Sequence, residues 1–304
     1  MNTIVKYLEL IRFSHTLFAL PFALLSAAMA VKLNLSENPA WHLRFTDAAG
    51  ILLCMVFARS AAMSFNRIAD RKIDAVNPRT ANRHLPKKLL TVSSVWIFTT
   101  CCSLGFIAST LLFFPNVIPA VFSVPVLFFL LLYSYAKRWT AGAHFWLGTA
   151  LMLAPMAAWV VIRPPTALVP PEWPPMILGL AVLFWSSSFD IIYATQDAEF
   201  DKKTGLHSVP GRFGVSAAFR LAALCQAVAV VLFAAVPLVY PPFGVLFWCG
   251  VAVTAVILAA EHWIATPKKE QSVALVRVNI AFFHLNAVIS IGLFLIGVLD
   301  AFVV

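Results

Sequence analysis

Charged residues are scarce in this chain. Only 12% of its 304 residues are Asp, Glu, Lys or Arg, whereas 61% are hydrophobic. A soluble globular domain carries about twice that share of charge. The scarcity excludes an ordinary soluble protein. It also makes the position of every carboxylate informative, because the whole chain has only 13 Asp and Glu residues.

Cysteine is scarce as well, and its distribution excludes two kinds of site. None of the cysteines forms a Cys-x-x-Cys pair, their number is odd, and all lie inside apolar runs: Cys54, Cys101, Cys102, Cys225 and Cys249. This pattern argues against a disulfide framework and against a zinc site. We interpret these residues as small apolar side chains of helices.

Long uncharged runs, by contrast, are abundant, and several approach the roughly 20 residues that span a bilayer. They predict an all-α, polytopic membrane protein that forms one domain, with a central cavity open toward cytoplasmic loops. The start of the chain is polar and amphipathic, so we expect no cleavable signal peptide. The nine predicted transmembrane helices are residues 14–33, 46–67, 91–113, 117–135, 143–162, 175–197, 214–237, 243–265 and 281–302.

Basic residues alternate between the connections of these helices. Eighteen of the 22 Lys and Arg residues fall on one side, and the exceptions are Lys32, Arg44, Arg59 and Arg163. Because cytoplasmic connections carry the excess of Lys and Arg, the N-terminus is predicted to be cytoplasmic and the C-terminus external. This topology accounts for the net charge of +9, so we expect no nucleic acid partner.

Two polar stretches end apolar runs on the predicted cytoplasmic side. The first contains Asn66, Asp70 and Asp74, and the second contains Tyr193, Asp197 and Asp201. On a helix, a spacing of four keeps side chains on nearly one face. A constant offset of 127 positions relates the two sets. This offset suggests two related helical halves followed by a final helix.

The chemistry of these stretches suits a metal ion and an anion. Carboxylates at a membrane surface are costly unless they are paired or bind a metal. Aspartate oxygens suit Mg2+, which usually bridges to a substrate phosphate, and Asn66 can hydrogen-bond a phosphate oxygen. The basic residues around the stretches would hold the anion: Arg59, Arg71, Arg79, Arg83 and Lys202. A single Asp-x3-Asp pair is better interpreted as a solvated helix end, but two copies on one side favour a diphosphate site.

These residues resemble the two aspartate-rich motifs of the UbiA superfamily of intramembrane aromatic prenyltransferases. The matching patterns are Asn66-x3-Asp70-x3-Asp74 and Asp190-x2-Tyr193-x3-Asp197-x3-Asp201. The segments 79–86 and 205–208, the chain length and the helix count are similar too. The start, from Arg12-Phe-Ser-His to Leu-Pro21-Phe, is most similar to the 4-hydroxybenzoate polyprenyltransferase-like branch. That branch also contains menaquinone-pathway enzymes of the futalosine route.

The resemblance implies transfer of a polyprenyl group from an isoprenyl diphosphate to an aromatic acid, for ubiquinone or menaquinone. The site would lie on the cytoplasmic side of a bacterial inner membrane, with membrane lipid around it. The four motif aspartates (Asp70, Asp74, Asp197 and Asp201) would hold Mg2+. Asp190 would orient or deprotonate the acceptor, and Tyr193 would hydrogen-bond the acceptor or a phosphate oxygen. Gln196 departs from the Lys of many members, so a positive contact is missing there or comes from Lys202 or Lys203.

Three other interpretations remain open from the sequence. The same chemistry on another acceptor, such as a naphthoate, homogentisate, haem or chlorophyllide, depends on cavity shape. A transporter would use its acids as an ion path, but transport carboxylates usually lie near the middle of the membrane at broken helices. A membrane phosphotransferase would need a more clustered acidic motif with glycines, which the chain lacks.

Overall fold

A computed structural model of the chain describes residues 3–12, 18–165, 172–266 and 281–303. All regular elements of these residues are helices, which confirms the predicted all-α class. The chain divides into two compact units: unit 1 contains residues 1–16 and 44–139, and unit 2 contains residues 17–43 and 140–304. The single domain expected from the sequence stays a prediction.

The described residues contain eight helices that are long and apolar enough to cross a membrane. A further helix of 18 residues, α2 (Leu20–Glu37), corresponds to the first predicted span. Residues 14–17 of that span lie outside the described residues, as do Lys268, Lys269 and Arg277 of the charge count. The protein is therefore a polytopic membrane protein with about the predicted number of spans.

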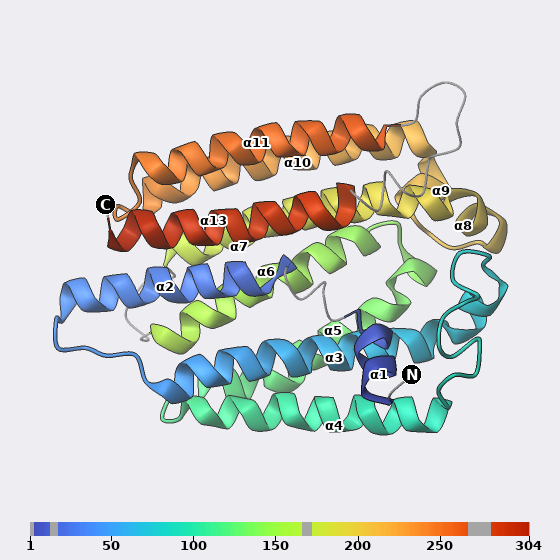
Figure 1. The fold of residues 1–304 in the computed structure, drawn as a ribbon, viewed down its shortest axis with the longest axis horizontal. Helices are drawn as coiled ribbons and strands as arrows, with labels where there is room; N and C mark the ends of the chain where they lie inside the picture. Colours follow the sequence, from blue (N-terminus) through green and yellow to red (C-terminus); the bar gives the residue numbers. More distant parts are fainter. Residues whose placement is uncertain (1–2, 13–17, 166–171, 267–280, 304) are drawn as a thin grey trace. The chain divides into compact units, whose positions relative to one another are not determined.

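Unit 1 is built on the longest helix, α3. Its elements are α1 (Thr3–Leu10), α3 (Phe45–Val76), α4 (Val92–Thr110), the 3₁₀ turn η2 (Leu111–Phe113) and α5 (Ile118–Trp139). Both α4 and α5 pack on α3, as Figure 1 shows for α3 and α4. Small residues allow close approach between these helices: the Thr99 hydroxyl of α4 donates to Ser64 of α3 at 2.8 Å. The three helices thus form the frame that carries the first acidic stretch.

Unit 2 is organised around α7 (Trp173–Ala194), which packs against both α6 (Ala143–Ile162) and α10 (Val215–Val239). Its further elements are α2, the 3₁₀ turn η3 (Thr195–Asp197), α8 (Ala198–Thr204), α9 (Val209–Phe213), α11 (Val245–Ala265), the π-helical turn η4 (Ala281–Leu285) and α13 (Asn286–Phe302). In Figure 1, α10 and α11 run side by side, and α13 packs along α11.

The end of α3 corrects the prediction from hydropathy. The apolar run ends near residue 67, but the helix continues to Val76, so the first acidic stretch lies inside the helix. Arg and Lys end the hydrophobic run without ending the helix, because both are good helix formers. The helix stops at Asn77, which is extended, as is usual for a residue before a proline.

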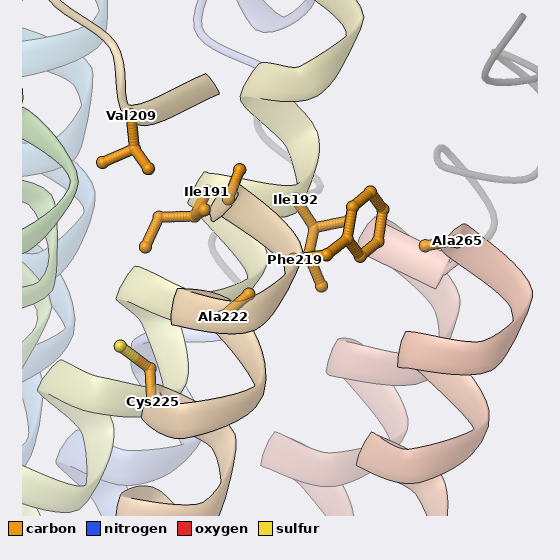
Figure 2. Close-up of a cluster of buried hydrophobic side chains, with 8 residues drawn as sticks. Ile191, Ile192, Val209, Phe219, Ala222, Cys225 and Ala265 are labelled. Atoms are coloured by element: carbon orange, nitrogen blue, oxygen red, sulfur yellow. The ribbon is translucent and has the colours of Figure 1, made fainter. Parts of the chain in front are cut away.

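A buried cluster joins the C-terminal end of α7, where the second acidic stretch begins, to its neighbours in unit 2. Figure 2 shows Ile191 and Ile192 of α7 beside Phe219, Ala222 and Cys225 of α10, with Val209 and Ala265 at the edges. All of these side chains are at most 6% exposed. Van der Waals packing of these side chains holds helices together in a membrane, so the cluster fixes the end of α7 from which the second acidic stretch starts.

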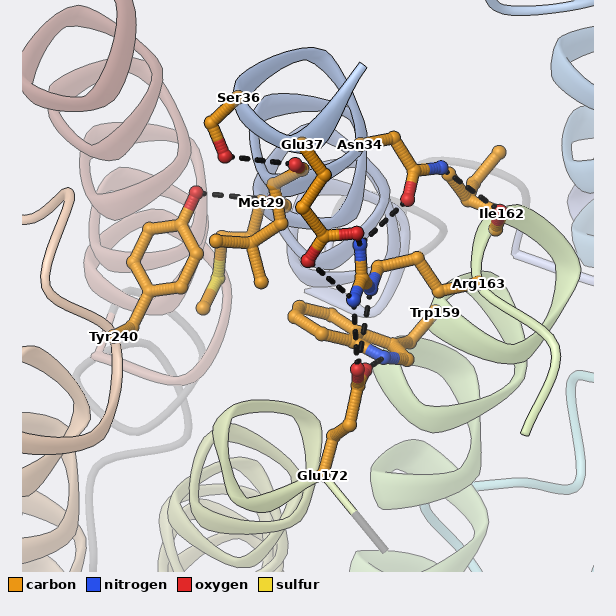
Figure 3. A network of polar contacts seen from close by, with 10 residues as sticks. Met29, Asn34, Ser36, Glu37, Trp159, Ile162, Arg163, Glu172 and Tyr240 are labelled. Atoms are coloured by element: carbon orange, nitrogen blue, oxygen red, sulfur yellow. Dashed lines mark hydrogen bonds and ion pairs between the residues drawn. The ribbon is translucent and has the colours of Figure 1, made fainter. Parts of the chain in front are cut away.

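A polar network centred on Arg163 lies at the N-terminal end of α7, the end opposite the buried cluster (Figure 3). The guanidinium donates to both oxygens of Glu37 at 3.0 Å, to Glu172 Oε1 at 3.0 Å and to Asn34 Oδ1 at 2.6 Å. Trp159 also donates to Glu172. These contacts connect α2 to the ends of α6 and α7.

We predict that Arg163→Gln lowers the stability of the detergent-solubilised protein by about 2 kcal/mol, because it removes several charge-assisted hydrogen bonds at once. Thermal unfolding measures the loss. Arg220→Gln removes the same charge from an exposed position of α10 and serves as the control. Equal melting temperatures for the two variants would contradict the role of the network.

The network also predicts a pH dependence. Hydrogen bonds from Arg163 hold the pKa of the Glu37 carboxyl below its ordinary value. A lowered pKa in the folded state stabilises the fold at neutral pH, and that contribution is lost as the pH falls through the ordinary and then the lowered value. We expect Glu37→Gln to narrow the difference in melting temperature between neutral and acidic pH slightly, because the Glu37 side chain is 62% exposed.

Candidate active site

The first acidic stretch presents Asp70 on one face of α3. Asp70 Oδ2 accepts a hydrogen bond from Asn66 Nδ2 at 2.9 Å, as their four-residue spacing predicts. Asp70 Oδ1 accepts another at 3.0 Å from Arg138 Nη2, which also donates to the Ala69 carbonyl at 2.8 Å. The Asp70 side chain is still 26% exposed. The carboxylate is therefore paired with a cation and accessible to a ligand.

Asp74 is more deeply placed and is held by the segment that follows α3. Arg83 Nη1 donates to both Asp74 oxygens, at 2.7 and 2.9 Å, and the Asp74 side chain is 7% exposed. The Thr80 hydroxyl donates to the Asp74 carbonyl at 3.1 Å, and the Arg79 N–H donates to Asn77 Oδ1 at 2.9 Å. These bonds fold the basic segment back onto the end of the helix.

Two other arginines of α3 from the predicted site differ in environment. Arg71 is exposed and donates to the Ile68 carbonyl of its own helix at 2.8 Å. Arg59 lies two turns before Asn66, and its Nη2 contacts the Arg12 carbonyl at 3.4 Å. Its Nε is buried and lacks a hydrogen-bond partner within the described residues. A buried donor of this kind is costly, and a bound anion would satisfy it.

The second acidic stretch is not one continuous α-helical face. The chain leaves α7 at Ala194, tightens into the 3₁₀ turn η3 and continues as α8. A 3₁₀ turn has three residues per turn, so the four-residue spacing does not keep one face here. Asp197 and Asp201 are both buried, at 8% and 3% exposure. Gly205 ends α8 with a positive φ of 71°, a conformation that glycine adopts without strain.

Asp190 lies two helical turns before Asp197 and forms a close pair with a histidine. His144 Nδ1 and Asp190 Oδ2 are 2.6 Å apart. The imidazole belongs to α6, it is fully buried, and its Nε2 accepts the Val209 N–H at 3.3 Å. The pair therefore joins α6, α7 and α9 within unit 2.

The remaining residues predicted for the second stretch lie around it. Tyr193 is partly buried and packs against the cluster of Figure 2. Lys202 and Lys203 are exposed. Gln196 carries a buried Nε2 that has no partner in the part of the chain that is described. A neutral donor therefore stands beside Asp197, where a lysine was expected from the resemblance.

One family profile covers most of the chain, and its description is the UbiA prenyltransferase family. It matches residues 19–287. The chain belongs to the UbiA prenyltransferase family. The enzyme class predicted from the two motifs, a prenyltransferase, is thereby confirmed.

Curated relatives of this UbiA family member are 4-hydroxybenzoate octaprenyltransferases. The protein of Marinomonas sp. (strain MWYL1) is 31% identical over 216 residues, which cover 70% of this chain and 72% of the relative. That of Acidovorax ebreus (strain TPSY) is 30% identical over 227 residues, 73% of this chain and 72% of the relative. The match to the Nitrosomonas europaea protein reaches 35% identity but spans only about half of each chain, 54% and 55%.

Solved structures of UbiA homologues share the fold. The apo structure of a homologue from Aeropyrum pernix K1 matches with a TM-score of 0.78 at 29% identity, and the match covers 92% of this chain and 95% of that one. A homologue from Archaeoglobus fulgidus bound to DMAPP and Mg2+ matches with a TM-score of 0.68 at 20% identity, over 98% and 100% of the chains. The second likeness concerns the fold alone.

The UbiA motif acids fit a hard cation in their chemistry. Asp70 and Asp74 belong to unit 1, and Asp197 and Asp201 belong to unit 2. Among the described residues, no group of three or more His, Cys, Asp or Glu side chains could hold a metal ion. Each unit contains two of these carboxylates, and carboxylate oxygens are suitable ligands for Mg2+. The four-aspartate magnesium site stays a prediction.

Two site residues were missed from the sequence. Arg138 counted only as one of the basic residues that set the topology, although it is the ion-pair partner of Asp70. His144 was not singled out, because a lone histidine in an apolar run carries no pattern of its own. A Cβ at Gly148 would lie 2.3 Å from Ser187 Oγ, so α6 and α7 touch there.

We predict that Gly211→Ala in this UbiA enzyme displaces Asp201. A Cβ at Gly211 would lie 3.0 Å from Asp201 Cβ and 2.9 Å from Ser208 Oγ, so one of the two elements must shift. We expect prenyl transfer to fall about tenfold or more, since small misplacements near reacting groups are costly. The control is Gly292→Ala, where a Cβ meets nothing within 4 Å. Full activity of the Gly211 variant would contradict the prediction.

Proposed function

We propose that this prenyltransferase transfers a polyprenyl group from an isoprenyl diphosphate to an aromatic acid similar to 4-hydroxybenzoate, in ubiquinone or menaquinone biosynthesis. The relatives named 4-hydroxybenzoate octaprenyltransferase support the acceptor class. The proposed location is a bacterial inner membrane, with the N-terminus and the site on the cytoplasmic side, as the distribution of Lys and Arg indicates.

The observation that carries the proposal is that two motif acids form ion pairs with arginines. We infer that these arginines exchange the acids for a diphosphate when the substrate binds. Asp70 contacts Arg138 and Asp74 contacts Arg83. Each carboxylate is ready for a cation, and each guanidinium has the geometry to grip a phosphate oxygen. When a magnesium diphosphate enters, Arg83 and Arg138 would turn from the acids to the diphosphate. The aspartates then keep a cationic partner in both states.

Asp70, Asp74, Asp197 and Asp201 would hold Mg2+, which when bound neutralises charge on the departing diphosphate. The chain's own cations add to that effect, because preorganised positive groups stabilise developing negative charge. Asn66 would orient a phosphate oxygen, and Arg59, Arg71, Arg79 and Lys202 would complete the anion site. The Gln196 amide would donate a neutral hydrogen bond where other members place a lysine.

The ring of the acceptor then forms the new bond. The allylic C–O bond breaks with its electron pair on the diphosphate, and a ring carbon donates a pair to the allylic carbon. Asp190 would take the proton of the ring hydroxyl, and Tyr193 would hydrogen-bond the acceptor or a phosphate oxygen. The alkylated ring carbon loses its proton to solvent as aromaticity returns, and Asp190 returns its proton to the ring oxygen, so one proton is released overall. Apolar helices keep out water, which would otherwise capture the allylic cation.

We predict that Asp70→Asn and Asp197→Asn each reduce prenyl transfer by about 100-fold or more, since each removes a carboxylate proposed to hold the Mg2+ that neutralises the leaving group. Transfer of a radiolabelled isoprenyl group to 4-hydroxybenzoate measures the effect, and thermal unfolding confirms that the variants are folded. Glu199→Gln is the matched control, because Glu199 lies between Asp197 and Asp201 in sequence but is exposed. Near-normal transfer by either Asn variant would contradict the proposal.

Removal of divalent metal tests the cofactor separately. We expect chelation with EDTA to abolish both prenyl transfer and diphosphate release, and added Mg2+ to restore them. An assay that offers several aromatic acids with one labelled donor then identifies the acceptor. Full activity in EDTA would refute the magnesium requirement, and transport of an ion without release of diphosphate would favour the transporter.

A further inference from the structure

The His144–Asp190 pair fixes which nitrogen of the imidazole carries a proton. A backbone N–H can only donate, so the contact of the Val209 N–H with Nε2 at 3.3 Å requires Nε2 to accept. A neutral imidazole then carries its hydrogen on Nδ1, which faces Asp190 Oδ2 at 2.6 Å. Asp190 Oδ2 therefore accepts at this contact.

The surrounding helices hold the imidazole rigidly. The His144 ring is 0% exposed, and the Ser187 hydroxyl contacts the His144 carbonyl at 3.2 Å. Gly148, one turn further along α6, leaves no room for a Cβ against Ser187 and Leu183. The donor that faces Asp190 is thus placed by the close packing of α6 on α7 and by the start of α9.

The two oxygens of the Asp190 carboxylate differ in their contacts. Oδ2 is engaged by His144, whereas Oδ1 has no hydrogen bond among the described residues, and the Asp190 side chain is 13% exposed. Seven residues separate Asp190 from Asp197, which corresponds to about 10 Å along a helix. Oδ1 is therefore available to hydrogen-bond the hydroxyl of an acceptor, at a position before the aspartates proposed to act on the diphosphate.

We propose that His144 is the positioning residue of Asp190: its Nδ1–H holds Oδ2 so that Oδ1 takes the proton of the acceptor's hydroxyl. The inference rests on the proposed function. His144 is buried and does not touch the substrate, so it acts only through Asp190. In the step itself the O–H bond breaks, its proton passes to Oδ1, and the ring's electron pair forms the carbon–carbon bond as the allylic C–O bond breaks toward the diphosphate. The alkylated ring carbon then loses its proton to solvent, and Asp190 returns its proton to the ring oxygen.

Two substitutions separate this role from a purely structural one. His144→Asn can keep an N–H donor at the place of Nδ1 but loses the acceptor for Val209. His144→Gln can keep an acceptor at the place of Nε2 but loses the donor to Asp190. A positioning role predicts that the Asn variant retains activity, whereas a structural link between α6 and α9 predicts that the Gln variant does.

The experiment measures kcat, and KM for both substrates, in the full-length enzyme, together with thermal unfolding. We expect His144→Gln to lower kcat about 100-fold, the typical effect of a general base, with KM for the isoprenyl diphosphate unchanged. The kcat of the His144→Asn variant should stay within a few-fold of the wild-type kcat. In an Asp190→Asn background, His144→Gln should cause no further loss, because both changes remove the same function.

The outcomes separate this inference from the proposed function. Three results would overturn the inference while the proposed function stands. The two His144 variants could have equal kcat, only the His144→Gln variant could retain its kcat, or the loss of kcat could simply follow the loss of melting temperature. A wild-type enzyme that prenylates no aromatic acid would contradict the proposed function and overturn the inference with it. Rescue by Asn but not by Gln would support both.

Discussion

A carboxylate at the edge of a bilayer must have a partner, and this constraint governs the site. Isolated ionised groups are costly in an apolar medium. In the described residues Asp70 pairs with Arg138, Asp74 pairs with Arg83, and Asp190 pairs with His144. The first two pairs use guanidinium cations that can also bind phosphate, and the third uses an imidazole N–H. The kind of partner thus separates the anion site from the position proposed for the acceptor.

The packing of the helices brings these partners to the carboxylates. Arg138 reaches Asp70 only because α5 lies on α3, and His144 reaches Asp190 only because Gly148 lets α6 touch α7. The segment after α3 folds back through Thr80 and Arg83 onto Asp74. The buried cluster of Figure 2 fixes the end of α7. Apolar packing therefore positions the polar groups, since few other polar contacts are available in so hydrophobic a chain.

Much of this could be predicted from the sequence, and the rest could not, for physical reasons. Length and hydropathy gave the helices, because a bilayer requires long apolar segments. The spacing of Asn66 and Asp70 gave their contact, because it lies within one helix. Hydropathy placed the end of α3 too early, and the 3₁₀ turn before Asp197 was not predicted. Arg138 and His144 escaped notice because their partners lie 68 and 46 residues away, a distance that local patterns do not encode.

The proposed function depends most on one untested step, that the acids of both motifs act on one magnesium diphosphate. Affinity for a non-hydrolysable isoprenyl diphosphate analogue in Mg2+, measured for Asp70→Asn, Asp197→Asn and the double variant, tests it most directly. Groups that share one ligand are strongly non-additive, so the double variant should bind hardly more weakly than either single variant. Independent, additive losses, or unchanged binding in either single variant, would contradict the account.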